Sequence, residues 1–171
     1  MKAFALLSTL LLLLPFSIAS LEETCRNVTG SEEGYNLCVT SLQVVPGSRT
    51  ADTKGLAVIA TQLLEANYTH NLDKAKELLK DEGLSPSITK ALGVCSNVYE
   101  PASQRLQTAI NKLKSGNIAE AVEDMRKVAG APNDCESAFH DVNEKSPLSK
   151  ENVDAFSLGN VAFAIVALLQ E

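Results

Sequence analysis

The chain has 171 residues, about the length of one domain, and carries 15 Lys and Arg against 21 Asp and Glu, a net charge of −6. This acidic balance argues against nucleic-acid binding and against docking on an anionic membrane, because both require a basic face. Two His, four Cys and no Trp leave little material for a metal site or a His-based nucleophilic centre.

The first 19 residues have the pattern of a secretory signal peptide. A basic start at Lys2 is followed by an apolar run over residues 3–18, and the small residues Ser17 and Ala19 suit cleavage after Ala19. Cleavage after Ser20 is the alternative. We therefore expect a secreted protein of the extracellular space or cell wall, rather than of the vacuole, with oxidised cysteines.

The remaining chain, residues 20–171, is predicted to form one domain in two parts. Residues 20–46 form a short arm of two helical pieces, and residues 50–171 contain four helices joined by short connections. Helices joined in this way alternate in direction. We therefore expect an all-α fold, an up-down-up-down four-helix bundle with an N-terminal helical hairpin. Because secreted proteins are glycosylated at Asn-X-Ser/Thr sequons, we also expect N-glycosylation at Asn27 and Asn67.

The first bundle helix is predicted over Thr50 to Glu82, with Asp52 helping its N-terminus. Its apolar stripe is weakest around residues 67–70. The residues expected on its buried side are Leu56, Ile59, Leu63, Leu72, Ala75 and Leu79.

The second bundle helix is predicted over residues 85–113. Ser85 is a suitable N-cap, and Pro86 occupies the first helical position, where a missing N–H is harmless. Pro101 lies off the apolar seam, so it should bend this helix rather than end it. The seam recurs every four and three residues, as in a bundle helix. It consists of Ile88, Leu92, Cys95, Tyr99, Ala102, Leu106, Ala109 and Leu113.

The third bundle helix is predicted from Asn117, where Asn117 and Glu120 have the spacing of a capping box. Because the seam keeps its phase across residues 130–133, we interpret this region as one kinked helix, with a true break as the alternative. The seam consists of Ile118, Ala121, Met125, Val128, Pro132, Cys135, Phe139 and Val142.

The fourth bundle helix is predicted from an N-cap at Ser149 to about Leu169. Its stretch over residues 161–169 is apolar on all sides but is too short to span a bilayer. We interpret it as a central buried helix and expect no membrane partner.

Four cysteines allow three disulfide pairings. Cys95 and Cys135 each lie 18 residues from the turn that joins their helices. In an antiparallel hairpin they would be level, each about 27 Å from that turn, and both occupy the inward seam. This favours Cys95–Cys135 and leaves Cys25–Cys38 to close the arm.

Sequence signatures of catalysis are absent. No GxSxG elbow, HExxH motif, Gly-rich phosphate loop or Cys/His cluster of metal-binding spacing occurs. His70 and His140 are better explained as surface or helix-end residues. We therefore expect no catalytic residue, no metal ligand and no cofactor, and a protein that acts by contact.

An ordered set of motifs carries a resemblance to the plant invertase and pectin methylesterase inhibitors over nearly the whole mature chain. It is most similar to the subgroup of a plane-tree pollen allergen, an invertase inhibitor by name. The matching segments are residues 25–38 around Tyr35-Asn36-Leu37-Cys38, residues 48–57, Cys95 with Tyr99, residues 113–116, residues 135–139 and residues 146–152. The resemblance implies a four-helix bundle with a helical hairpin and the same disulfide pairing. It also implies a secreted plant enzyme as partner.

The resemblance offers two target enzymes. Invertase inhibitors of the family share a Pro-Lys-Phe tripeptide at the start of the third bundle helix, which enters the enzyme's cleft. The matching positions here are Ile118-Ala119-Glu120, without the cation or the aromatic ring. Glu120 would be repelled by a carboxylate-lined site. Pectin methylesterase is therefore favoured over acid invertase as the target of a monomeric inhibitor that occludes the active-site cleft in a 1:1 complex.

Contact residues for such occlusion should be polar and exposed near a shared helix turn. The residues that meet these criteria are Ser115, Asn117, Glu120, Glu123 and Asp124, and Ile118 and Ala119 are further candidates because they match the family tripeptide. The alternative function is a non-inhibitory helical binding protein of the pollen-allergen type.

Overall fold

The N-terminal arm is a helical hairpin made of α1, Leu21–Val28, and α2, Glu32–Gln43. Serines precede both helices, and the hydroxyls of Ser20 and Ser31 each accept a hydrogen bond from a first-turn N–H at 3.1 Å. The Cys25–Cys38 disulfide closes the hairpin as expected. The computed structural model describes residues 20–170, so the expected signal peptide lies outside the described residues.

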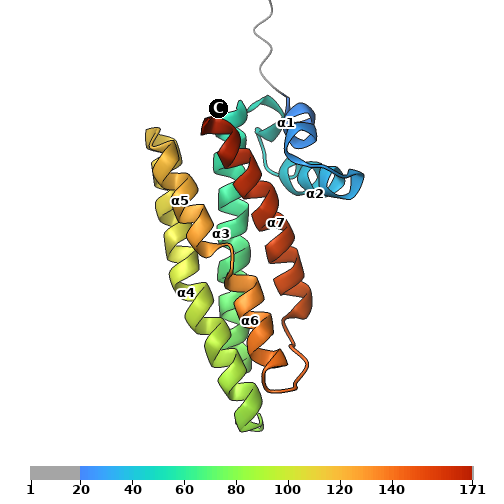
Figure 1. The fold of residues 1–171 in the computed structure, drawn as a ribbon, viewed down its shortest axis with the longest axis vertical. Helices are drawn as coiled ribbons and strands as arrows, with labels where there is room; N and C mark the ends of the chain where they lie inside the picture. Colours follow the sequence, from blue (N-terminus) through green and yellow to red (C-terminus); the bar gives the residue numbers. More distant parts are fainter. Residues whose placement is uncertain (1–19, 171) are drawn as a thin grey trace, which may run out of the picture.

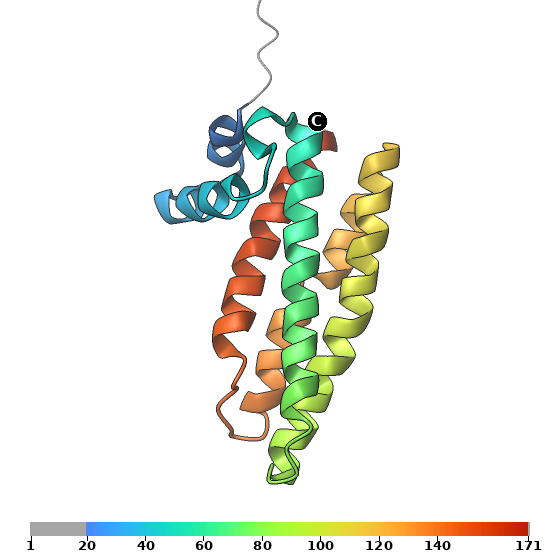
Figure 2. The ribbon, with the colours of Figure 1, turned by 180° about the vertical axis from the view of Figure 1, so that it is seen from behind.

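Four antiparallel helical segments form the bundle (Figures 1 and 2). They are α3, Thr53–Leu78; α4, Pro86–Ser115; the stacked pair α5, Ile118–Val128, and α6, Ala131–His140; and α7, Ser149–Ala167, with 3₁₀ turns η1, Ser48–Thr50, and η2, Leu168–Gln170. The up-down-up-down prediction is confirmed. The arm, the α4–α5 turn and the C-terminal end of α7 all lie at one end of the molecule, with the arm and the turn on opposite sides (Figure 1).

Side-chain caps form at two of the four predicted helix starts. Asp52 accepts a hydrogen bond from the N–H of Gly55 at 2.7 Å, and Ser85 accepts one from the N–H of Ile88 at 3.2 Å. The predicted N-cap at Ser149 is wrong, because Ser149 is the first helical residue of α7. Its hydroxyl instead donates to a side chain of α6.

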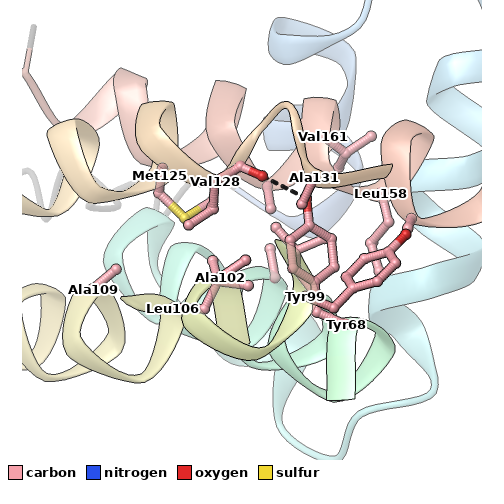
Figure 3. Packing of buried hydrophobic residues seen from close by; sticks show 14 of the residues in the cluster. Tyr68, Tyr99, Ala102, Leu106, Ala109, Met125, Val128, Ala131, Leu158 and Val161 are labelled. Atoms are coloured by element: carbon pink, nitrogen blue, oxygen red, sulfur yellow. Dashed lines mark hydrogen bonds between the residues drawn. The ribbon is translucent and has the colours of Figure 1, made fainter. Parts of the chain in front are cut away.

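The third bundle segment is two helices rather than one kinked helix. Pro132 has no N–H to donate to the carbonyl of Val128 four residues earlier, so the backbone ladder is interrupted there. The freed Val128 carbonyl accepts a hydrogen bond from the hydroxyl of Tyr68 at 3.1 Å (Figure 3). The alternative of a true break is therefore correct, although the seam keeps its phase.

The core is built on the two predicted seams. Apart from Ile88, Ile118 and Val142, which are half-buried, every seam position is buried. The prediction for α3 was less accurate, because Ile59, Leu63 and Leu79 are only half-buried and the helix ends at Leu78. The residues that α3 buries are Leu56, Ala57, Ala60, Thr61, Leu64, Tyr68, Asn71, Leu72 and Ala75.

Tyr68 therefore lies in the core, although it belongs to the stretch where the apolar stripe appeared weakest. Its ring meets that of Tyr99 edge to face, with centroids 5.1 Å apart and an angle of 76° between the planes. Burial, with a smaller contribution from Tyr99, raises the pKa of Tyr68 far above its ordinary value. The phenol therefore stays protonated as the donor to α5.

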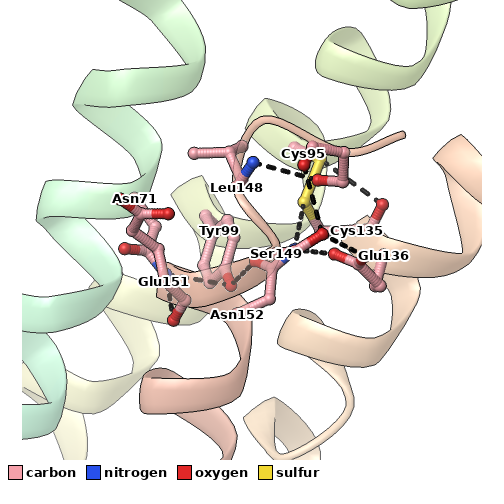
Figure 4. The surroundings of a disulfide bond; sticks show 10 residues. Asn71, Cys95, Tyr99, Cys135, Glu136, Leu148, Ser149, Glu151 and Asn152 are labelled. Carbon is pink, nitrogen blue, oxygen red and sulfur yellow. Dashed lines mark hydrogen bonds between the residues drawn. A yellow bond between two sulfur atoms is a disulfide. The ribbon is translucent and has the colours of Figure 1, made fainter. Parts of the chain in front are cut away.

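A buried polar network surrounds the Cys95–Cys135 disulfide, which joins α4 to α6 as predicted (Figure 4). The Tyr99 hydroxyl donates to Asn152 at 2.6 Å and accepts from Asn71 at 3.1 Å. Burial raises the pKa of Tyr99 to about 12, so it too remains a donor.

The network continues from α7 to α6. The amide of Asn152 donates to Glu136 at 2.8 Å, and the hydroxyl of Ser149 donates to the other carboxylate oxygen of Glu136 at 2.6 Å. All four bundle segments are therefore linked by hydrogen bonds around one disulfide. A buried polar group that is left without its hydrogen-bond partner costs free energy, so separating these helices is unfavourable. The network therefore restricts the motion of this half of the bundle.

Helix α7 packs against α3, α6 and the arm. Together with η2 it is 22 residues long, its most apolar 18-residue stretch has a mean hydropathy of 1.6, and it is the one described helix long and apolar enough to cross a membrane. A core helix passes the same test, and here the helix is the fourth member of the bundle. Its apolar stretch is less enclosed than predicted, because Phe163 and several neighbours are only half-buried.

Candidate inhibitory surface

The α4–α5 turn is a rigid two-residue connection. Gly116 has a positive φ of 85°, which favours glycine, and the N–H of Asn117 donates to the carbonyl of Lys112 at 2.9 Å, closing the last turn of α4. The ammonium of Lys54 on α3 donates to the carbonyl of Lys114 at 3.2 Å. The start of α5 is therefore held in a fixed position at the end of the bundle.

Most of the predicted contact residues surround this turn and face solvent. Ile118 is half-buried against the core, as its seam position requires. The exposed ones are Ser115, Asn117, Ala119, Glu120 and Glu123.

Asp124 does not share this exposure, and the prediction for it is wrong. Its side chain is only 5% exposed and accepts hydrogen bonds from Arg105 at 3.1 Å and from Lys112 at 2.8 Å. Asp124 precedes the seam residue Met125, which turns it toward α4. Burial alone would raise the pKa of Asp124, but the two cations outweigh it and hold the pKa below its ordinary value.

The predicted capping box at the start of α5 does not form. The side chain of Asn117 makes no capping hydrogen bond, and Glu120 points to α4, where its carboxylate lies 3.2 Å from the ammonium of Lys112. The hydrogen bonds that the Lys112 ammonium donates to Asp124 and Glu120 raise the pKa of Lys112. Glu120 keeps 66% of its side chain exposed, so it remains available to a partner.

A shallow hollow of about 470 Å³ lies beside the turn, lined by residues 116–120 and by Gln170. Sequence reasoning missed Gln170, for which no motif gives a signal. It also missed the two cations of α4, although a signal existed: each directly precedes a seam leucine, as Asp124 precedes a seam methionine. Opposite charges at such flanking positions of facing helices are expected to pair.

The two sequons lie in different surroundings. Asn27 is exposed on α1, whereas Asn67 is half-buried on α3. Among residues 20–170, no group of three or more His, Cys, Asp or Glu side chains is placed to hold a metal ion. Both histidines of the chain are exposed.

Comparison with known proteins decides what kind of protein this is. Residues 19–165 match the family described as plant invertase/pectin methylesterase inhibitor. The chain belongs to this family. Its members are inhibitor proteins rather than catalysts, so the chain is an enzyme inhibitor and not an enzyme.

Individual relatives in the family are named either as inhibitors of invertase or fructosidase, or as inhibitors of pectinesterase. A Platanus acerifolia protein named "Putative invertase inhibitor" is 33% identical over 165 residues, covering 94% of this chain and 92% of its own length. The "Cell wall / vacuolar inhibitor of fructosidase 2" of Arabidopsis thaliana is 30% identical, covering 82% of each chain. "Pectinesterase inhibitor 12" of the same plant is 26% identical, covering 71% of this chain and 70% of its own.

A solved structure shares the fold. The crystal structure of a mutant form of a pectin methylesterase inhibitor from Arabidopsis superposes with a TM-score of 0.72 at 18% identity, covering 87% of this chain and 97% of that one. At this level of identity the match establishes the helical architecture described above.

Proposed function

We propose that the protein is a secreted, monomeric inhibitor of plant cell-wall pectin methylesterase that covers the enzyme's active-site cleft in a 1:1 complex. The candidate contact surface is the α4–α5 end of the bundle. It combines a fixed backbone with exposed polar side chains, and these are the properties of a surface that binds without reorganising.

The observation that supports pectin methylesterase over invertase is the first turn of α5. Ile118 is half-buried, Ala119 is small, and Glu120 is paired with Lys112. This turn offers neither a cation nor an aromatic ring to insert into a carboxylate-lined pocket. An exposed, polar helix end is better suited to lie across an open cleft.

Acid invertase is the second candidate, because the relatives with the higher identities are named as inhibitors of invertase or fructosidase. Those proteins share the family fold with this chain. If invertase were the target here, this chain would have to bind it without the Pro-Lys-Phe tripeptide, through other residues.

Titration of both enzymes with the purified protein tests the proposal. We expect pectin methylesterase activity to fall to a plateau at one inhibitor per enzyme, with a complex of that stoichiometry in size-exclusion chromatography, and acid invertase to be unaffected. Loss of invertase activity alone would support the second candidate. No loss of either activity at micromolar inhibitor would contradict inhibition and favour the non-inhibitory binding protein.

A further inference from the structure

A groove of about 900 Å³ separates the arm from the bundle. One wall is formed by the α1–α2 turn and α2, and the other by α7 with a short part of α3. Polar side chains line both walls, with Ser31 and Ser41 on the arm and Ser157 and Asn160 on α7. The apolar side chains of Leu37 and Leu158 lie between them.

Asn67 of the second sequon is part of the wall of this groove. Its Oδ1 atom is buried and has no hydrogen-bond partner among the described residues. The next residue, Tyr68, points in the other direction into the core, and the hydroxyl of Thr69 donates to Glu65 at 3.1 Å. The sequon therefore directs its asparagine into the groove while its neighbours are held elsewhere.

Asn27 of the first sequon provides an internal comparison. It is exposed on α1 and does not line the groove. A sugar attached to Asn27 would extend into solvent, whereas a sugar attached to Asn67 would begin between the arm and α7.

We propose that Asn67 carries an N-linked glycan whose first sugars occupy this groove and brace the arm against α7. The inference rests on the proposed secretion, because the sugar donor is a lipid pyrophosphate-linked oligosaccharide of the secretory pathway. The Asn67 Nδ2 atom forms a bond to the anomeric carbon of the first N-acetylglucosamine. The bond from that carbon to the pyrophosphate breaks, the lipid pyrophosphate leaves, and Nδ2 loses one proton to a base.

The lining of the groove matches this occupant. Sugar hydroxyls both donate and accept, so they can bond to Ser and Asn side chains on both walls, and the C–H faces of a sugar ring can pack on leucine. A glycan here would add to the packing of α1 and α2 against α7 and to the exposed ion pair of Arg49 with Glu22 at 2.8 Å, which links α1 to the segment preceding α3.

Intact mass of the protein from plant cells tests the modification. The full chain with its own first 19 residues is expressed and recovered from whole-tissue extract, so that all of it is measured whether or not it is exported. We expect Asn67→Gln and Thr69→Ala each to lose the mass of one glycan, and Thr69→Ser to keep it. An unmodified Asn67 in the parent protein would overturn the proposal.

Accessibility of the two glycans tests the groove. Protein made with a mannosidase inhibitor is treated with an endoglycosidase that cuts between the first two N-acetylglucosamines. In the native protein we expect cleavage at Asn67 to be about tenfold slower than at Asn27, because the groove must open first, and both rates to be equal after denaturation. Equal rates in the native protein would place the Asn67 glycan outside the groove.

Amide exchange tests the bracing. Protection of residues 32–43 should fall about tenfold in Asn67→Gln and remain unchanged in Asn27→Gln. Unchanged protection in both would contradict the bracing role. These measurements do not use enzyme inhibition, so they can fail while the proposed inhibitor function holds, and the reverse.

Discussion

The two halves of the third bundle segment are held in different ways. Helix α6 is fixed by the Cys95–Cys135 disulfide and by a hydrogen-bond network that extends from the buried Tyr99 and Asn152 to the half-buried Glu136. Helix α5 is held along its edge by the ion pairs of Asp124, whose partners remain partly exposed, and its outer face carries exposed polar side chains. The exposed residues of α5 can therefore be substituted without loss of the fold. This makes α5 the better candidate for a recognition surface.

Removal of the α6 disulfide should have the largest effect on stability. Cys95→Ser with Cys135→Ser opens a loop of 40 residues, and the chain-entropy estimate of the loss is about 4 kcal/mol. We expect a large fall in the melting temperature of the whole helical signal in circular dichroism.

The matched control is Cys25→Ser with Cys38→Ser in the arm. This change should leave the bundle transition in place and loosen only α1 and α2, which are too short to be stable alone. Loss of most of the helical signal in this control would contradict the division into an arm and a bundle.

The break between the two halves can be tested at Tyr68. Tyr68→Phe leaves the buried Val128 carbonyl without a donor, which should cost about 1–3 kcal/mol in urea unfolding. Pro132→Ala restores a backbone N–H four residues after Val128, so the cost of Tyr68→Phe should be smaller in that background.

Tyr35→Phe serves as the control, because Tyr35 is only half-buried on the arm and its ring lies beside Arg26. Its effect should be close to zero. An equal cost of Tyr68→Phe with and without Pro132 would refute the compensation between the proline and the tyrosine.

Asp124 gives the α5 half a pH dependence. Its pKa is lowered in the folded protein, so its contribution to the free energy of unfolding is present above the unfolded pKa of about 3.9 and is lost as pH falls through the folded value. Asp124→Asn should therefore cost about 1–2 kcal/mol at pH 7 and at pH 5. The difference from the parent should shrink toward pH 2, and a constant difference in urea unfolding over this range would be inconsistent with the lowered pKa.

The comparison also explains what could be predicted from the sequence. The heptad seams specify which face of α4, α5 and α6 is buried, and this determines the antiparallel register and hence the Cys95–Cys135 pairing. Hydrophobic patterns do not record side-chain hydrogen bonds between distant helices. Tyr68 continues the stripe of Leu64 and Leu72 on α3, so its burial had a signal in the spacing, whereas its hydrogen bond to the Val128 carbonyl, 60 residues away along the chain, had none.

The same limit applies to the candidate surface. Its location at the α4–α5 turn followed from the resemblance and from the seam, because residues beside inward positions near a turn face solvent. The burial of Asp124 and the orientation of Glu120 depend on Arg105 and Lys112 of the facing helix. A pattern read along one helix at a time does not contain this pairing.

The smallest effect on stability, and the sharpest test of the comparison, is expected from Glu120→Lys with Glu123→Lys. Both carboxylates are exposed, and their ion pairs with Lys112, Arg126 and Lys127 should contribute at most about 0.5 kcal/mol each, so the melting temperature should stay nearly constant. Reversal of two charges on a binding surface should instead change the association rate with pectin methylesterase and its dependence on salt. The matched control is Glu144→Lys, an exposed reversal in the α6–α7 loop at the far end of the bundle (Figure 1). Unchanged inhibition by the double variant at low and moderate salt would place the contact surface elsewhere, with the polar faces of α3 and α4 as the next candidates.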